Sequence, residues 1–114
     1  LRRKQVIVVM SKTFSNMDVL LIDKQLACEI GLKEVIVFHE IAKLIRDSRI
    51  VHDNKQWVVI TTEELQERLP FFSVSTVGRA LNRLIEIDFL EVGTWGREDA
   101  FDKRRWFTIG GASR

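Results

Sequence analysis

Two helix-start signals lie on either side of the single proline of the chain. Thr61 and Glu64 have the spacing of a capping box, which begins a helix. Pro70 disfavours the helical conformation for the residue before it, so this helix must end there. Ser73 then supplies the N-cap of a second helix, predicted to run to about residue 87. Two short helices joined by a tight turn form a helix-turn-helix, so the chain is restricted to folds that contain this motif.

The second helix has an apolar side and a polar side. Its apolar residues lie three and four apart and form one stripe that faces the domain: Val74, Val77, Leu81 and Leu84. Its other faces carry Ser73, Ser75, Thr76, Arg79, Asn82 and Arg83. A recognition helix inserts its N-terminal part into the major groove, where arginine binds guanine edges and asparagine binds adenine edges. We therefore predict that these six residues contact DNA; the alternative is an ordinary solvated face.

The rest of the chain predicts an α+β domain, mainly α, with the architecture of a winged helix-turn-helix. Two helices come first, and the second is so apolar that we expect it at the centre of the domain. A β-rich run precedes the helix-turn-helix, and two strands follow it as a hairpin, the wing. The predicted helices cover residues 22–32 and 32–48, the turn covers 51–55, and the strands cover 56–60, 89–95 and 104–109.

Length and composition indicate one domain with two terminal extensions. A chain of 114 residues corresponds to a single domain, and 46% hydrophobic residues suffice for its core. Residues 1–18 are predicted as a basic arm with a possible strand at 6–10, residues 19–110 as the winged helix-turn-helix, and residues 111–114 as a tail or the start of a linker. The strand at 6–10 would either pair two copies of the chain or extend the domain's own sheet.

Net charge, cysteine content and apolar runs limit the partners and the cellular compartment that can be predicted for the chain. The net charge of +2 is only mildly basic, so the placement of charges, rather than their sum, must support a DNA contact. The single cysteine, Cys28, is expected to be buried in the first helix and cannot form an internal disulfide, which suits a reducing compartment. The longest apolar run, residues 6–10, is too short to cross a membrane. A cytoplasmic protein, associated with the nucleoid or a replicon and without a membrane partner, is therefore predicted.

Basic and hydroxyl side chains outside the second helix are predicted to hold DNA phosphates. They lie in the wing, at the start of the first helix of the motif and in the arm: Arg97, Lys103, Arg104 and Arg105; Thr61 and Thr62; Arg2, Arg3 and Lys4. Two alternatives accompany this prediction. Glu98, Asp99 and Asp102 dilute the charge of the wing, and Arg105 can instead stack inside the fold beside Trp106. The arm can equally be a disordered terminus.

No constellation of residues predicts catalysis. The two histidines, His39 and His52, do not have metal-ligand spacing with Cys28. The sequence GTWG at residues 93–96 lacks the lysine and the strand-to-helix setting of a phosphate-binding loop. We therefore predict neither enzyme activity nor a metal or cofactor.

Three stretches of the chain read LACEIGLKEVIVFHEIAKLI, KQWVVITTEELQERLPFFSVSTVGRALNRLIEIDFLEV and DKRRWFTI. Together, over residues 26–109, they resemble the N-terminal winged-helix domain of phage and plasmid replication-initiation proteins of the replisome-organiser type. The resemblance implies binding to origin or operator DNA, with a separate C-terminal part of the longer members recruiting helicase machinery. It also assigns recognition-helix positions to Ser73, Ser75, Thr76, Arg79 and Arg83.

Two residues depart from the family pattern. Asp88 stands where the family usually has glycine after the recognition helix, and aspartate tolerates the left-handed backbone that such a turn requires. Phe107 stands where the family often has tyrosine. Plasmid-segregation proteins that bind centromere repeats, and small transcriptional repressors, use the same scaffold, so these roles are alternatives to replication.

The sequence thus predicts specific binding to double-stranded DNA, at repeated sites in a replication origin or operator. One small domain reads few base pairs, so we expect a homodimer or several copies on the DNA, with replication proteins as possible further partners. The alternative is a winged helix that binds protein without DNA, which the near-neutral charge favours.

Overall fold

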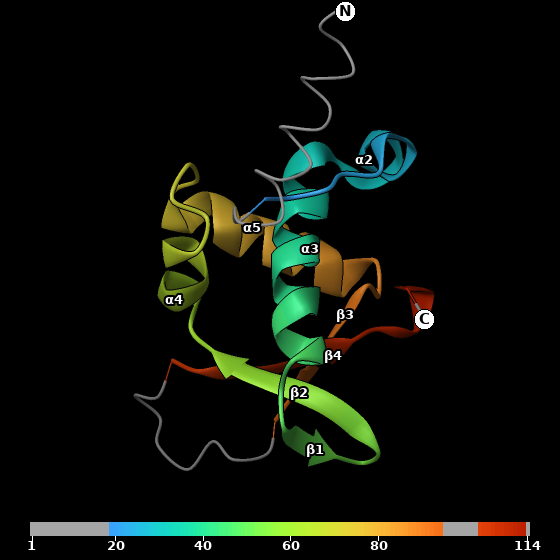
Figure 1. Cartoon of the computed structure of the whole chain (residues 1–114), viewed down its shortest axis with the longest axis vertical. Coiled ribbons are helices and arrows are strands. Elements are labelled where there is room, and N and C mark those ends of the chain that lie inside the picture. Colours follow the sequence, from blue (N-terminus) through green and yellow to red (C-terminus); the bar gives the residue numbers. More distant parts are fainter. Residues whose placement is uncertain (1–18, 95–102, 114) are drawn as a thin grey trace, which may run out of the picture.

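The computed structural model describes residues 19–94 and 103–113, which form an α+β fold of four helices and one four-stranded antiparallel sheet (Figure 1). The helices are α2 (Lys24–Ile30), α3 (Leu32–Arg46), α4 (Thr62–Glu67) and α5 (Val74–Glu86). The strands are β1 (Ile50–His52), β2 (Lys55–Ile60), β3 (Leu90–Gly93) and β4 (Arg105–Ile109), and a 3-10 turn, η1 (Gly111–Ser113), follows. The predicted arm, its strand at residues 6–10 and the wing tip at 95–102 lie outside the described residues.

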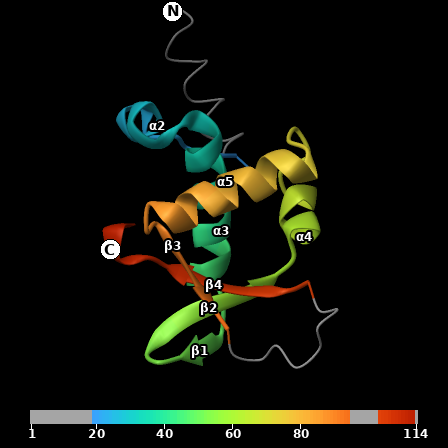
Figure 2. The same cartoon turned by 180° about the vertical axis from the view of Figure 1, so that it is seen from behind.

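The sheet has the strand order β1-β2-β4-β3, and the helices gather on one side of it (Figures 1 and 2). β4 lies between two neighbours: Phe107 pairs with Val58 of β2 and with Val92 of β3. The predicted hairpin of the last two strands is therefore confirmed. β2, which comes from the middle of the chain, extends that hairpin into a larger sheet.

The central position predicted for the apolar helix is confirmed. Val37 and Ile41 of α3 are fully buried, and the helix packs against α5 on one side and against β2 and β4 on another. Phe107 of β4 is equally buried in the same cluster. The core thus lies where α3 meets α5 and the helix-facing side of the sheet.

β1 is a strand that the sequence prediction missed, because residues 51–55 were expected to form only a turn. Asp53 and Asn54 have φ angles of 55° and 61°, the two left-handed residues of a type I′ hairpin turn. His52 pairs with Lys55 directly across this turn. β1 has three exposed residues, and so short a run has no alternation of buried and exposed positions that a sequence pattern could reveal.

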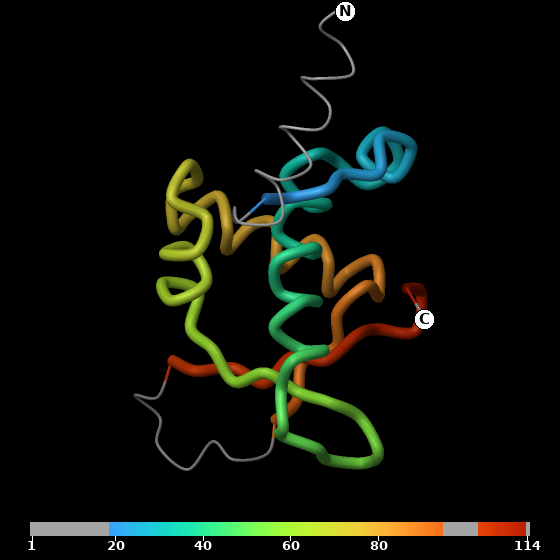
Figure 3. Tube along the Cα trace, viewed as in Figure 1, coloured from blue at the N-terminus to red at the C-terminus, as the bar shows by residue number. Residues whose placement is uncertain are grey.

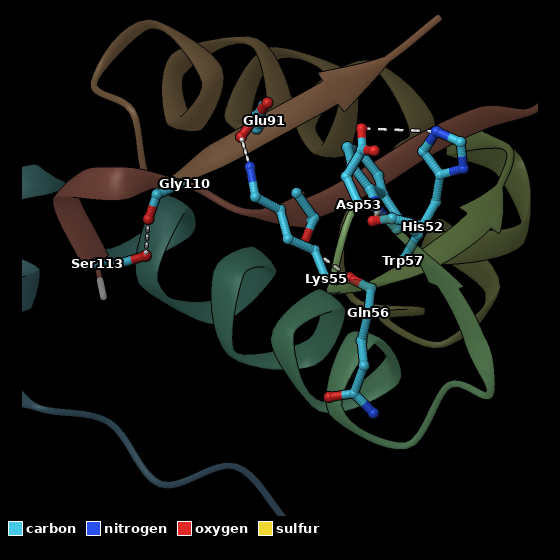
Figure 4. Close-up of polar contacts among 9 residues, drawn as sticks. His52, Asp53, Lys55, Gln56, Trp57, Glu91, Gly110 and Ser113 are labelled. Carbon is cyan, nitrogen blue, oxygen red and sulfur yellow. Dashed lines mark hydrogen bonds and ion pairs between the residues drawn. The ribbon is translucent and has the colours of Figure 1, made fainter. Parts of the chain in front are cut away.

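The sheet face that points away from the helices is held by polar contacts (Figure 4). Lys55 Nζ lies 3.2 Å from Glu91 Oε2, so an ion pair spans β4 and links β2 to β3. The indole N–H of Trp57 donates to the carbonyl oxygen of His52 at 2.9 Å. The same indole meets Trp106 edge-on, with ring centroids 6.4 Å apart. These contacts fasten all four strands into one sheet.

The prediction that Cys28 is buried is wrong, because its thiol is exposed. α2 begins at the predicted N-cap, Asp23, whose carboxylate accepts a hydrogen bond from the amide of Leu26 at 3.1 Å. Figure 3 shows this helix at the edge of the molecule, beyond the N-terminal end of α3. None of its seven residues is fully buried, and the partly buried ones are Leu26, Ala27 and Ile30. Cys28 lies on the other side of the helix.

The left-handed turn predicted at Asp88 is confirmed by its φ of 63°. The residues predicted as a tail pack onto this turn. The amide of Ala112 donates to the carbonyl of Asp88 at 2.9 Å, and the hydroxyl of Ser113 donates to the carbonyl of Phe89 at 3.1 Å. A Cβ atom at Gly110 would lie 2.2 Å from the Asp88 carbonyl oxygen, so only glycine permits this approach.

Candidate nucleic-acid interface

The start of α4 has the predicted capping box. The amide of Glu64 donates to the hydroxyl oxygen of Thr61 at 3.0 Å, and the amide of Thr61 donates to the carboxylate of Glu64 at 3.1 Å. The next residue, Thr62, accepts a hydrogen bond from Arg105 at 3.4 Å. Both threonines predicted to hold phosphate are therefore already engaged within the domain, Thr61 in the cap and Thr62 with β4.

The turn between α4 and α5 is fixed at both ends. α4 ends at Glu67, before Pro70, as predicted. The side-chain amide of Gln66 donates to the carbonyl of Phe72 at 2.9 Å, which ties the last turn of α4 to the start of α5. The hydroxyl oxygen of Ser73 accepts the amide of Thr76 at 3.1 Å, the predicted N-cap bond. The angle between the two helices is therefore set by local hydrogen bonds as well as by the core.

The predicted apolar stripe of α5 needs one correction. Val77, Leu81 and Leu84 are fully buried as expected, but Val74 is 39% exposed. Val74 is the first residue of the helix and precedes the part of α5 that packs on the domain. Ala80, which the sequence analysis did not assign to the stripe, is buried beside Leu81 and Leu84.

The polar side of α5 forms one exposed surface. Its exposed members are Ser73, Ser75, Arg79, Asn82 and Arg83, and Thr76 is half-buried. At 100° per residue, the side chains of Ser75, Arg79 and Arg83 lie in one row along the helix. Figure 2 shows α5 in front of α3, so the side of α5 opposite to α3 faces the viewer. The predicted contact residues are thus brought together on one side of one rigid element.

Glu86 lies in the same row and was missed by the sequence analysis. Its carboxylate oxygen Oε2 is 3.7 Å from Nη1 of Arg83, and both side chains are exposed. The spacing of three residues on a helix is the signal that identifies such a pair. The C-terminal end of this surface is therefore partly neutralised, whereas its N-terminal end carries Arg79 and small hydroxyl residues.

The described residues of the predicted wing occupy two different environments. Lys103 and Arg104 are exposed and immediately precede β4. Arg105 is half-buried, and its guanidinium lies 5.0 Å from the ring centroid of Phe107. The alternative weighed for Arg105, stacking inside the fold, therefore describes its position, with the ring of Phe107 beneath its guanidinium. Arg97, like Arg2, Arg3 and Lys4, lies outside the described residues.

Metal-binding clusters and membrane-spanning helices are absent from the described part of the chain. Residues 19–94 and 103–113 contain no group of three or more His, Cys, Asp or Glu side chains arranged to hold a metal ion. No helix within these ranges combines the length and apolarity needed to cross a lipid bilayer. Comparisons with protein-family models, curated proteins and solved structures give no match. Function is therefore inferred from the geometry of the chain itself.

Proposed function

We propose that this domain is a winged helix-turn-helix that binds double-stranded DNA in a sequence-specific manner. The observation that carries the proposal is the division of α5 into two sides. One side is fully buried at Val77, Leu81 and Leu84, and the other exposes Ser75, Arg79 and Asn82. A helix anchored in this way is held rigidly while its polar side remains available to bind a ligand.

α5 acts as the recognition helix in this proposal. The major groove, roughly 12 Å wide, admits one α-helix. Small residues at the N-terminus, Ser73 and Ser75, allow the helix to approach the bases closely. Arg79 then reaches guanine, and Asn82 reaches adenine, from the middle of the helix. Arg83 completes the row, with its charge shared with Glu86.

The hairpin of β3 and β4 acts as the wing. Lys103 and Arg104 are exposed immediately before β4 and hold the phosphate backbone. Arg105 instead fixes the wing to α4 through Thr62. The recognition helix and the wing therefore bind adjacent parts of the DNA from one rigid frame.

Repeated or palindromic sites are the expected targets. A single domain of this size contacts few base pairs, so two or more copies are needed for specificity. The resemblance to replication-initiation proteins favours a replication origin or operator as the location. Segregation repeats and repressor operators present the same kind of target to the same scaffold.

A second candidate function is a winged helix that binds protein. The Arg83–Glu86 pair favours it, because a carboxylate in the recognition row repels phosphate. The two functions differ in their response to salt. Binding through phosphates weakens steeply as salt rises, because counterions are released from the DNA.

The test is fluorescence anisotropy with duplex DNA from the locus around the coding gene, beside a scrambled duplex, at two salt concentrations. Tighter binding to the native duplex that persists at the higher salt is the expected result. Binding to neither duplex contradicts the proposal and directs attention to a protein partner.

A further inference from the structure

A groove runs between α3 and α4 on the side of the sheet that carries the helices. Its upper hollow, of about 300 Å³, is lined by Leu20, Glu40 and Phe71 among others. Its lower hollow, of about 430 Å³, is lined by Leu44, Ile60 and Glu67 among others. Arg68 lines both hollows, and each also borders α3, through Glu40 in the upper one and Leu44 in the lower one. We call this surface the α3–α4 groove.

The α3–α4 groove has an apolar floor and acidic walls. Leu44 and Ile60 supply apolar surface, and Phe71 at the upper end is 56% exposed. Glu40 is buried and lies 3.3 Å from Arg68 Nε. Besides Glu40, the groove is lined by Glu64 and Glu67, so it holds three acidic residues and one arginine. Glu40 is paired with that arginine, and the Glu64 carboxylate accepts the amide of Thr61, so the groove keeps a net negative charge. A ligand that fits this surface is a segment with an apolar centre and a positive charge.

We propose that the α3–α4 groove binds the N-terminal segment of this same chain, residues 1–14. This segment has an apolar run at residues 6–10, and its charged side chains are all basic: Arg2, Arg3, Lys4 and Lys12. Because the segment is positive and the groove is negative, the groove favours this segment over a neutral or acidic one. The apolar run matches the floor, and the basic residues match the carboxylates of the walls.

The connection of the chain permits this docking. The described structure begins at Val19, next to Leu20, which lines the upper hollow. Ten extended residues span roughly 33 Å. α3, with 15 residues, is about 22 Å long. The segment therefore reaches from one end of the groove to the other.

The groove and the polar side of α5 face in different directions. α3 and α4 lie in front of α5 in Figure 1, whereas α5 lies in front of α3 in Figure 2. A segment held in the groove therefore keeps Arg2, Arg3 and Lys4 away from DNA bound to α5. This inference stands independently of the proposed function, and it gives the arm a role within the domain.

Paramagnetic relaxation in the full chain tests the docking. Cys28→Ser removes the exposed thiol, and Gln5→Cys carries a spin label beside the apolar run without altering it. We expect strong broadening of the amide signals of Leu44 and Ile60, and little at Arg79 on α5. Equal broadening at both places, or none in the groove, overturns the proposal.

A mixed sample identifies the chain that supplies the segment. Spin-labelled chains without isotope are mixed with isotope-labelled chains that lack the spin label. The proposal expects no broadening of the groove signals in this mixture. Broadening as strong as in the single-chain experiment shows that a second copy is the occupant and overturns the proposal.

Two charge-reversal variants on α4, one inside the groove and one outside it, test whether the acidic charge of the groove holds the segment. Glu67 lines the groove, whereas Glu63, one turn earlier and equally exposed, does not line either hollow. We expect Glu67→Lys to reduce the broadening at Leu44 and Ile60 at least about two-fold, and Glu63→Lys to leave it unchanged. Equal effects of the two variants contradict the electrostatic part of the proposal.

Discussion

Arg105, the first residue of β4, donates a hydrogen bond from Nη2 to the hydroxyl oxygen of Thr62, the first residue of α4, at 3.4 Å. Its guanidinium also lies over the ring of Phe107, at 5.0 Å from the centroid. The hydrogen bond joins the last strand of the sheet to the helix that precedes α5, and the ring contact lies within β4. Arg105 therefore helps to hold the hairpin of β3 and β4 in place relative to α4.

Arg105→Lys tests this positioning role. Lysine keeps the positive charge but loses the planar group that both stacks and donates to Thr62. We expect DNA affinity to fall several-fold and the free energy of unfolding to fall by about 0.5–1 kcal/mol, as measured by anisotropy and urea denaturation. Arg104→Lys, at an exposed site, is expected to bind DNA as the parent does. Unchanged affinity for Arg105→Lys would show that its charge alone matters, as in a direct phosphate contact.

Glu86 is expected to weaken DNA binding. It lies in the same row as Arg79 and Arg83 and pairs with Arg83 at 3.7 Å. Glu86→Gln removes a charge that repels phosphate and releases Arg83, so we expect affinity to rise a few-fold at low salt and the gain to shrink as salt rises. Glu29→Gln on α2, far from this row, is the matched control. A gain of the same size in both variants would indicate a general effect of net charge.

Gly78 is expected to limit stability rather than to serve DNA binding. A Cβ atom at this position would lie 3.7 Å from Cγ2 of Thr62, an ordinary van der Waals distance. Alanine therefore fits, and its higher helix propensity is worth about 1 kcal/mol in the middle of a helix. Urea denaturation of Gly78→Ala should show this gain with unchanged DNA affinity. A stable variant that binds DNA poorly would instead place Gly78 against the DNA.

The buried carboxylate of Glu40 depends on Arg68. The side chain of Glu40 is 4% exposed, and that of Arg68 is 42% exposed. Arg68→Leu leaves the carboxylate without this partner and should lower the free energy of unfolding by about 2 kcal/mol. The loss is smaller than for a fully buried pair, because solvent screens the half-exposed Arg68. The double variant Glu40→Leu/Arg68→Leu should recover most of that loss. If the double variant unfolds more easily than the single one, Glu40 stabilises the domain through contacts other than Arg68.

The helices were predictable because their signals are local. The capping box of Thr61 and Glu64, the cap at Ser73 and the left-handed turn at Asp88 each depend on a few adjacent residues. β1 was not predictable, because its three exposed residues form no pattern of their own. The exposure of Cys28 depends on how much of α2 the rest of the domain covers, which is a property of the packing.

The polar surface of α5 could be predicted from the helical period, and its described members are exposed apart from the half-buried Thr76. The position of Arg105 could not be predicted from the sequence, because its hydrogen-bond partner, Thr62, lies 43 residues away in the chain. The pair of Arg83 and Glu86 could have been found from its spacing.

The most direct test of the central claim compares the DNA affinity of the parent with that of Arg79→Ala/Arg83→Ala. The control is Lys24→Ala/Lys33→Ala, which removes the same charge from exposed positions on α2 and α3. Each arginine that binds a base bidentately contributes about 1–3 kcal/mol, so the first variant should bind its site at least about 30-fold more weakly, with an unchanged unfolding midpoint. The control should bind nearly as the parent does. If the arginine variant binds as tightly as the parent, α5 is not the recognition helix.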